Sequence, residues 1–401
     1  MDWQTPEDTV PTAFITEANA RSVLGKPSAT GAWREGDPVG DRLFAAIGPM
    51  QLERGGELPS VRIAYETWGE LSPARDNAIL VLHALTGDSH VVGGPGPGHP
   101  TAGWWGSMIG PGKPIDTDRW FVVAPNMLGG CQGTTGPASH SPSGTEWGSR
   151  FPFVTIRDQV AAQVALTDHL GIDQWQAVLG GSMGGMQSLE WAVGHPDRLA
   201  RFAVFAAPAI SDADELARNS VQLEAIRMDP GFADGDYYEA ADGEGPHRGL
   251  ALARRLALLN YRSPGELGDR FARSWQSGVS PLGGGGRFAV ESYLDFHGNK
   301  FTRRFDANSY ITLMGAMNSH DIGRDRGGVI AALGRVTATA LVVGIDSDRL
   351  FPVRDQQLIA RNVARTSHGP DAVVLSSTFG HDGFLIEDAL VGAHIAGLLE
   401  H

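Results

Sequence analysis

A serine bracketed by glycines places the tightest constraint on how this chain can fold. The segment Gly180-Gly181-Ser182-Met183-Gly184-Gly185 follows a predicted short strand, Gln176–Leu179, and precedes a predicted helix from about Met186 to Val193. Strand, turn and helix in this order place the serine on a tight turn at the carboxyl edge of a sheet. Glycines are needed there because a Cβ would collide with the neighbouring strand or helix. The segment therefore predicts a turn from which the hydroxyl of Ser182 projects.

The rest of the chain alternates between strand and helix patterns. The run Ala78–Leu82 is apolar at every position, which is typical of a strand covered on both faces in a mostly parallel sheet. Thr155 and Asp158 form a start signal for a helix that extends to about Leu170. The alternation predicts an α/β fold with right-handed crossovers. Further strands are predicted at Val61–Thr67, Trp120–Ala124, Arg201–Phe205, Thr339–Val343 and Ala372–Ser376, and a final helix at about Leu385–Leu399.

The alternation is interrupted between residues 211 and 335. Helices are predicted there at Glu215–Arg227, Gly249–Tyr261 and Ser309–Asn318. We interpret residues 211–335 as a helical cap inserted over one end of a sheet whose core comprises residues 41–210 and 336–401. Residues 1–40 are polar, rich in glycine and proline and weakly periodic, which predicts a tail that lies on the body or is disordered.

Charge and cysteine content exclude several classes of function. The net charge of −14 argues against binding to nucleic acid or to an anionic membrane, because both need concentrated positive charge. A single cysteine, Cys131, excludes an intrachain disulfide framework and a multi-cysteine metal site. The first residues lack the pattern of a signal peptide, and the apolar run Ala78–Leu85 is too short to span a bilayer. We expect a cytoplasmic protein without a bound metal.

A nucleophilic serine needs a base, and the base needs an acid that orients it. Where a serine lies on such a turn, the acid and the histidine follow it in the chain. Asp346 and Asp348 both lie in the loop after the predicted strand Thr339–Val343, and the spacing does not decide between them. His381 lies in a glycine-bracketed loop after the last predicted strand. These residues predict acyl-transfer chemistry, either hydrolysis or transfer to another acceptor.

The negative charge that develops in such a reaction needs two N–H donors. We expect one from Met183, which follows the serine, and one from Leu85, in the loop after Ala78–Leu82. Cys131 is interpreted as structural, or as a wall of the site, because no partner histidine is indicated. The glycine-rich runs Gly93–Gly98 and Gly283–Gly286 lack the Gly-Lys-Ser/Thr ending of a phosphate loop and are interpreted as turns.

The chain resembles the homoserine O-acetyltransferases of methionine biosynthesis, and in particular their actinobacterial members. The resemblance covers nearly all of the chain after the tail and implies an α/β-hydrolase fold, a mostly parallel sheet flanked by helices with an inserted helical cap. The matching segments are His83–His90, Asn126–Pro137, Phe151–Val160, Gly180–Gln187, Phe305–Tyr310, His320–Gly328, Ser347–Pro352 and Gly380–Phe384, together with Asp236–Arg255 for the actinobacterial members.

The resemblance also implies roles for individual residues. Ser182 is the nucleophile, Asp348 rather than Asp346 the acid, and His381 the base. Arg254 holds the carboxylate of the amino-acid substrate, and Asp382 holds its ammonium group. A zwitterionic substrate needs one cation and one anion at matching spacing, and an arginine fork suits a carboxylate.

The implied reaction is a ping-pong transfer of acetyl from acetyl-CoA, a co-substrate rather than a bound cofactor, to L-homoserine. By the same resemblance we expect a homodimer formed through the cap helices. The residues that bind the phosphates of CoA are not identified by their spacing. Three alternatives stay open: transfer with succinyl-CoA as donor or serine as acceptor, plain ester hydrolysis, and a non-catalytic binding protein of the same fold.

Overall fold

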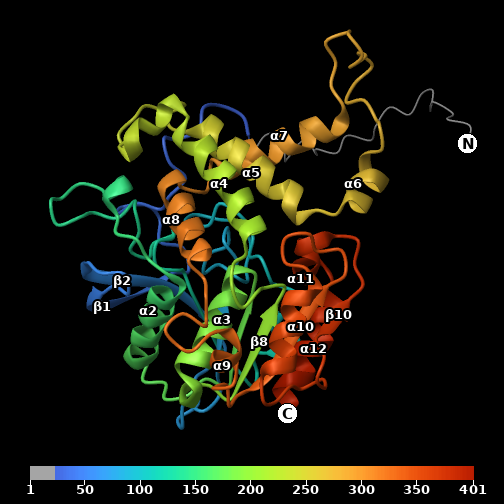
Figure 1. Cartoon of the computed structure of the whole chain (residues 1–401). Helices are drawn as coiled ribbons and strands as arrows, with labels where there is room; N and C mark the ends of the chain where they lie inside the picture. The colour runs from blue at the N-terminus through green and yellow to red at the C-terminus, as the bar shows by residue number, and fades with distance from the viewer. Residues whose placement is uncertain (1–22) are drawn as a thin grey trace, which may run out of the picture.

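An eight-stranded sheet forms the centre of the protein (Figure 1). The structure, a computed structural model, describes residues 23–401. The strand order is β1-β2-β6-β3-β7-β8-β9-β10; the pairs β1–β2 and β2–β6 are antiparallel, and the remaining pairs are parallel. The predicted mostly parallel sheet is therefore confirmed. The strands are β1 (Leu43–Gln51), β2 (Glu57–Trp68), β3 (Ala78–Leu82), β6 (Phe121–Pro125), β7 (Ala177–Gly181), β8 (Arg201–Phe205), β9 (Thr339–Ile345) and β10 (Val373–Leu375), with β4 (Ile109–Gly110) and β5 (Ile115–Asp116) as a separate pair.

Both faces of the sheet are covered, which explains the unbroken apolar run of β3. Ile79 and Val81 point into a core to which α12 contributes, whereas Leu80 and Leu82 point into a core shared with α2 and α3. Side chains alternate between the two faces of a strand, so a strand covered on both sides needs apolar residues throughout. Each such side chain contributes about 1.5–3 kcal/mol relative to exposure. The covering helices are α2 (Ile156–His169), α3 (Met183–Gly194), α10 (Val353–Asn362) and α12 (Asp388–Glu400).

A layer of five helices lies over one end of the sheet (Figure 1). Helix α5 packs against both α4 and α7, and α4 also packs against α8. Helix α4 begins after a capping aspartate, since the side chain of Asp212 accepts a hydrogen bond from the N–H of Glu215 at 3.0 Å. The short helix α9 (Val329–Leu333) packs against α10 instead. The layer comprises α4 (Ala213–Arg227), α5 (His247–Tyr261), α6 (Pro264–Phe271), α7 (Ala289–Phe301) and α8 (Ala307–Asn318).

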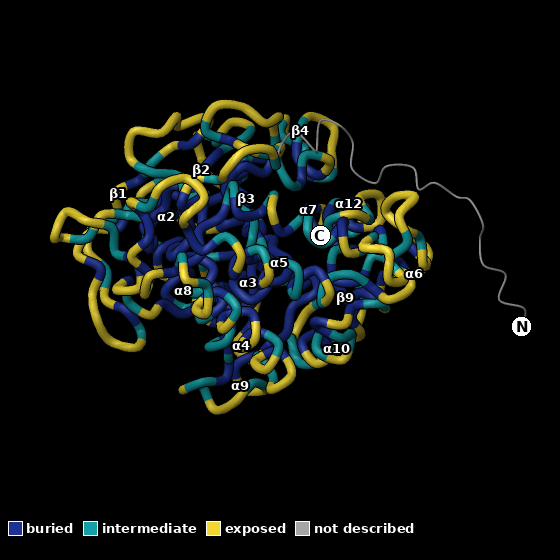
Figure 2. Tube along the Cα trace, turned by 90° about the horizontal axis from the view of Figure 1, so that it is seen from above, coloured by how far each residue is buried: buried dark blue, intermediate teal, exposed yellow. Residues whose placement is uncertain are grey.

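Residues 23–40, part of the segment predicted as a tail, lie on the body. The N–H of Trp33 donates to the carbonyl of Cys131 at 2.9 Å, and the hydroxyl of Thr30 donates to Asp306 at 2.8 Å. The remainder of the predicted tail, residues 1–22, lies outside the described residues. Viewed from above, buried chain fills the middle of the molecule around β3 and α3, and exposed loops form the rim (Figure 2).

Two expectations about element boundaries need correction, and one strand of the main sheet was not predicted. Helix α3 begins at Met183 rather than about Met186, because Ser182 has φ 56° and the helix follows it at once. The predicted final helix is two helices, α11 (Gly383–Ile386) and α12, separated by Glu387, whose ψ of 56° interrupts the helical hydrogen bonds. Strand β1 was not among the predicted strands. Among the described residues, no helix is both long enough and apolar enough to cross a membrane.

Candidate active site

The turn at Ser182 has the strained geometry that its glycines predict. Ser182 lies between β7 and α3 with φ 56° and ψ −124°, a region that side chains rarely adopt. Its N–H donates to the carbonyl of Phe205 in β8 at 2.9 Å, which holds the turn in place. A Cβ on Gly184 would collide with the carbonyl oxygen of Leu82, so this position accepts only glycine. The strain places a largely buried serine at the carboxyl end of the sheet, where backbone strain is often found at functional residues.

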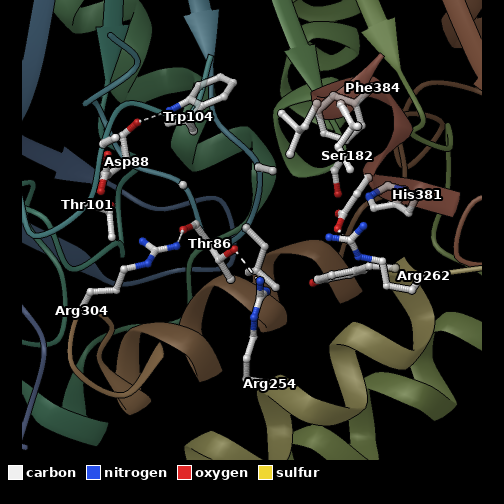
Figure 3. A pocket seen from close by; sticks show the side chains of 18 residues that line it. Thr86, Asp88, Thr101, Trp104, Ser182, Arg254, Arg262, Arg304, His381 and Phe384 are labelled. Atoms are coloured by element: carbon white, nitrogen blue, oxygen red, sulfur yellow. Dashed lines mark hydrogen bonds and ion pairs between the residues drawn. The ribbon is translucent and has the colours of Figure 1, made fainter. Parts of the chain in front are cut away.

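A histidine and an aspartate from later in the chain form a buried pair near this serine. His381 Nδ1 lies 2.8 Å from Asp348 Oδ2. The other carboxylate oxygen of Asp348 accepts the N–H groups of Leu350, at 2.7 Å, and Phe351, at 3.0 Å. Because the carboxylate accepts from Nδ1–H, neutral His381 presents an unprotonated Nε2. Figure 3 shows Ser182 and His381 side by side at one wall of a cavity.

The surroundings of His381 raise its pKa above the ordinary value. Burial lowers the pKa of this histidine, but the charge of Asp348 and its hydrogen bond, together with the charge of Asp382, outweigh the cost of burial. The protonated ring is therefore favoured more strongly than in an exposed histidine. A histidine tuned in this way can accept a proton and later return it.

Asp346, the other candidate for the acid, has a different environment. Its side chain accepts the N–H of Ser377 at 3.1 Å, and its own N–H donates to the carbonyl of Leu375 at 3.0 Å. These bonds connect the ends of β9 and β10. Within the part of the chain that the structure describes, Asp348 is the one of the two that bonds His381.

The serine and the histidine open into a cavity of about 300 Å³. Leu85, predicted to donate an N–H to the oxyanion, lies in its wall, and Met183 begins α3 directly behind the serine. Between residues 23 and 401, the N–H of neither residue donates to a main-chain carbonyl. Free N–H groups at the start of a helix stabilise negative charge. The geometry is therefore compatible with an oxyanion site between these two residues.

Arg254 reaches the same cavity from helix α5, on the side opposite the serine (Figure 3). Its guanidinium carbon lies 5.1 Å from the ring centre of Phe301 and 5.5 Å from that of Tyr261, and Nη1 lies 3.5 Å from the Thr86 hydroxyl. None of these contacts neutralises its charge. Its neighbour Arg255 forms an ion pair with Asp295 at 3.0 Å instead.

Asp382 lines the cavity too, but it already faces a cation. Its carboxylate lies 3.2 Å from Nε of Arg262, which also lines the cavity. Arg304 is a third cavity arginine and donates to the carbonyl of Thr86. The sequence reasoning missed both Arg262 and Arg304, because helix packing brings them to the site and no local motif marks them. The cavity thus holds three arginines against two aspartates, Asp88 and Asp382, in a chain with a net charge of −14.

Cys131 is not part of this cavity. Burial raises the pKa of its thiol to about 12, with a further contribution from the negative charge of Asp306. A thiol with such a pKa stays protonated and is a poor nucleophile at neutral pH. The structural interpretation of Cys131 agrees with this environment.

Comparisons with known proteins point to one family. A family described as the alpha/beta hydrolase fold matches residues 77–388. A homoserine O-acetyltransferase of Clavibacter michiganensis is 70% identical over 96% of this chain and 99% of its own length. Among solved structures, a homoserine O-acetyltransferase from Bacillus anthracis superposes with a TM-score of 0.80 at 26% identity over 90% of this chain and 97% of its own. The acetyl esterase MekB superposes with a TM-score of 0.76 at 28% identity, over the same shares of the two chains.

Proposed function

The chain belongs to the homoserine O-acetyltransferase family, acyltransferases of the α/β-hydrolase fold, and we propose that it transfers acetyl from acetyl-CoA to L-homoserine through an acetyl-serine intermediate. The observation that carries the mechanism is one cavity that holds Ser182, a histidine hydrogen-bonded to Asp348, and an arginine with no anionic partner among the described residues. The product, O-acetyl-L-homoserine, is an intermediate of methionine biosynthesis in this proposal.

The first half-reaction loads the serine. His381 Nε2 accepts the hydroxyl proton as Ser182 Oγ attacks the thioester carbonyl of acetyl-CoA. The N–H groups of Leu85 and Met183 stabilise the oxyanion of the tetrahedral intermediate. The carbon–sulfur bond then breaks, and the imidazolium of His381 returns its proton to the CoA thiolate. Asp348 keeps the ring in the required tautomer and stabilises its charge.

The second half-reaction unloads the serine onto the acceptor. His381 takes the proton of the homoserine side-chain hydroxyl, whose oxygen attacks the acetyl-serine carbonyl. The bond between the acetyl carbon and Ser182 Oγ then breaks, and the imidazolium of His381 returns its proton to Oγ. Arg254 binds the carboxylate of homoserine. Asp382 binds its ammonium group, which displaces part of the interaction that Asp382 has with Arg262. Cations in the cavity also favour an anionic donor, which addresses how an acidic protein attracts CoA.

Transfer rather than hydrolysis requires that water stays out of the cavity after acetylation. The layer α4–α8 is suited to excluding water because it supplies the wall opposite the serine.

The outer surface of the layer α4–α8 supports the expected homodimer: Val221 and Met228 at α4 are 56% and 73% exposed, and Leu252 and Leu259 on α5 are 43% and 41% exposed. A cytoplasmic homodimer joined through the cap helices remains our prediction, and its mass in solution tests it.

Ester hydrolysis is the second candidate, favoured by the similarity to the acetyl esterase MekB. Thiol release from acetyl-CoA or succinyl-CoA, followed with and without homoserine or serine, separates the candidates. We expect release from acetyl-CoA that depends on homoserine. Equal release without an acceptor indicates a hydrolase, and a preference for succinyl-CoA or serine reassigns the donor or acceptor.

A further inference from the structure

One wall of the cavity is a long segment between β3 and β4 that is anchored away from the catalytic residues. Leu85, Thr86, Asp88, Thr101 and Trp104 of this segment line the cavity. The segment contains no helix or long strand, so main-chain hydrogen bonds in its turns and side-chain anchors together determine its shape. One deeply buried anchor of this segment is His90, which is 2% exposed.

Both ring nitrogens of His90 face groups that only accept hydrogen bonds. Nδ1 lies 3.0 Å from the carboxylate of Glu66 in β2, and Nε2 lies 3.2 Å from the carbonyl oxygen of Gly94. A neutral imidazole carries one proton and would leave one of these contacts as a repulsion between lone pairs. We infer that His90 is a buried imidazolium, and that the Glu66–His90 ion pair is a positioning pair that holds the cavity wall in its reactive shape.

The charges around His90 stabilise the additional proton that makes its ring an imidazolium. Burial lowers the pKa of His90, but its hydrogen bond to Glu66 and the charge of Glu66 outweigh this, and Gly94 and Asp88 add to the same effect, so its pKa is raised. The ring of His99 stacks on His90 at 3.8 Å between ring centres, tilted by 13°.

The environment of His99, the ring stacked on His90, favours its neutral form. Burial lowers the pKa of His99, and Arg42 and His90 add positive charge that lowers it further, against the opposing charges of Glu66 and Asp88. Its Nε2 accepts the N–H of Asp41 at 2.9 Å, so this nitrogen carries no proton. The pair therefore consists of an imidazolium on a neutral imidazole, which is an attractive arrangement.

A short chain of hydrogen bonds connects this ion pair to the cavity. The hydroxyl of Ser89 donates to Glu66 at 2.9 Å, and the N–H of His90 donates to the carboxylate of Asp88 at 2.9 Å. The indole N–H of Trp104 donates to the carbonyl of Asp88, also at 2.9 Å. Asp88 and Trp104 both line the cavity, so a shift of His90 displaces the wall that also carries Leu85.

A divalent metal ion is the competing explanation. Ligand atoms of Asp41, Glu66, His90 and His99 all lie within 4.8 Å of one another, and two histidines with carboxylates are a familiar donor set. Two observations favour the proton: the lone pair of His99 Nε2 already accepts the N–H of Asp41, and Arg42 adds a positive charge beside the cluster. A bound metal is therefore an outcome that the test must detect.

The protonation state is measured directly by NMR on protein labelled with ¹⁵N in its histidine rings, with a His90→Gln variant to assign the signals. We expect both ring nitrogens of His90 to stay protonated at a pH where an exposed histidine is neutral. One unprotonated ring nitrogen at that pH would overturn the inference. So would one tightly bound metal per chain found by elemental analysis.

The positioning role is tested by Glu66→Gln, with Glu53→Gln as a matched control. Glu53 forms ion pairs with Arg157 and Arg324 and does not line the cavity. We expect Glu66→Gln to slow acetylation by acetyl-CoA about 100-fold per folded molecule, because a displaced wall misplaces the reacting groups. The Glu53→Gln variant should lose stability and keep its acetylation rate. A Glu66→Gln variant that loses only stability would refute the positioning role.

The rate measurement on Glu66→Gln rests on the proposed acetyl transfer, whereas the NMR measurement on His90 does not. If the wild type releases no thiol from acetyl-CoA, the proposed function fails and the protonation of His90 is still measured. If Glu66→Gln does not fold, the same NMR experiment on the wild type still decides whether His90 is an imidazolium.

Discussion

The two sides of the cavity are built in different ways. Ser182, Asp348 and His381 follow strands of the sheet, and hydrogen bonds from main-chain N–H groups fix each of their loops. The opposite side is formed by Arg254 and Arg304, which are supplied by the helical layer and reach the cavity through long side chains. The sheet side is held by the loops that follow the strands, and the arginine side is held by contacts that the arginine side chains make.

This difference separates chemistry from recognition. The serine, histidine and aspartate are suited to any acyl transfer, and the similarity of this fold to an acetyl esterase agrees with a general reactive side. The arginine side adds positive charge that a plain hydrolase does not require. We therefore expect substitutions on the sheet side to abolish the reaction with every acceptor, and substitutions on the arginine side to change which acceptor binds.

The largest effect is expected on the sheet side, for Asp348→Asn. The variant keeps the shape but removes the charge that stabilises protonated His381, so acetylation should slow by about 10⁴-fold. Asp346→Asn is the matched control, because Asp346 bonds Ser377 rather than the histidine. Stopped-flow thiol release measures both rates. Equal losses in the two variants would show that Asp348 has no special role.

A smaller and more selective effect is expected on the arginine side, for Arg254→Ala. Loss of a charge-assisted hydrogen bond should raise the KM for homoserine about 10- to 100-fold, with little change in the KM for acetyl-CoA. Arg255→Ala is the control, since Arg255 pairs with Asp295. Steady-state kinetics with each substrate varied in turn supply the comparison. An equal rise in the KM values for homoserine and acetyl-CoA would show that the arginine side does not select the acceptor.

The smallest effect is the pH dependence of the sheet side. His381 must be neutral to accept a proton, so kcat/KM for acetyl-CoA should rise about tenfold per pH unit below the raised pKa of His381. The contribution of His381 to stability has the opposite sign: it is present below the unfolded-state pKa and is lost as pH rises through the folded-state pKa. In Asp348→Asn the rising limb should move to lower pH. If the rising limb of the pH profile stays at the same pH in Asp348→Asn, a group other than His381 controls it.

The sheet side was largely predictable from the sequence, because its signals are local. Glycines around Ser182 report a turn that no side chain fits, and the order of serine, acid and histidine follows the order of the strands. Spacing alone did not choose between Asp346 and Asp348, since both lie in one loop and only tertiary structure turns Asp348 toward the histidine. The weak pattern of β1, an edge strand with mostly exposed or half-buried residues, explains why it was not predicted.

The arginine side was much less predictable. Arg254 was identified only by resemblance, and Arg262 and Arg304 were missed, because the packing of helices distant in sequence brings them to the cavity. The pairing of Asp382 with Arg262 is likewise a tertiary contact between residues that are 120 positions apart. The Glu66–His90 pair joins a strand to a loop in the same way and has no local signature.

Mass spectrometry of the intact protein after incubation with acetyl-CoA and no acceptor detects the proposed acetyl-serine intermediate. We expect one acetyl group per chain, located on Ser182, that is stable until homoserine is added and then leaves as O-acetyl-L-homoserine. The Ser182→Ala variant should carry no acetyl group under the same conditions. An adduct that persists in this variant, or one that water removes as fast as homoserine does, would contradict transfer through acetyl-Ser182.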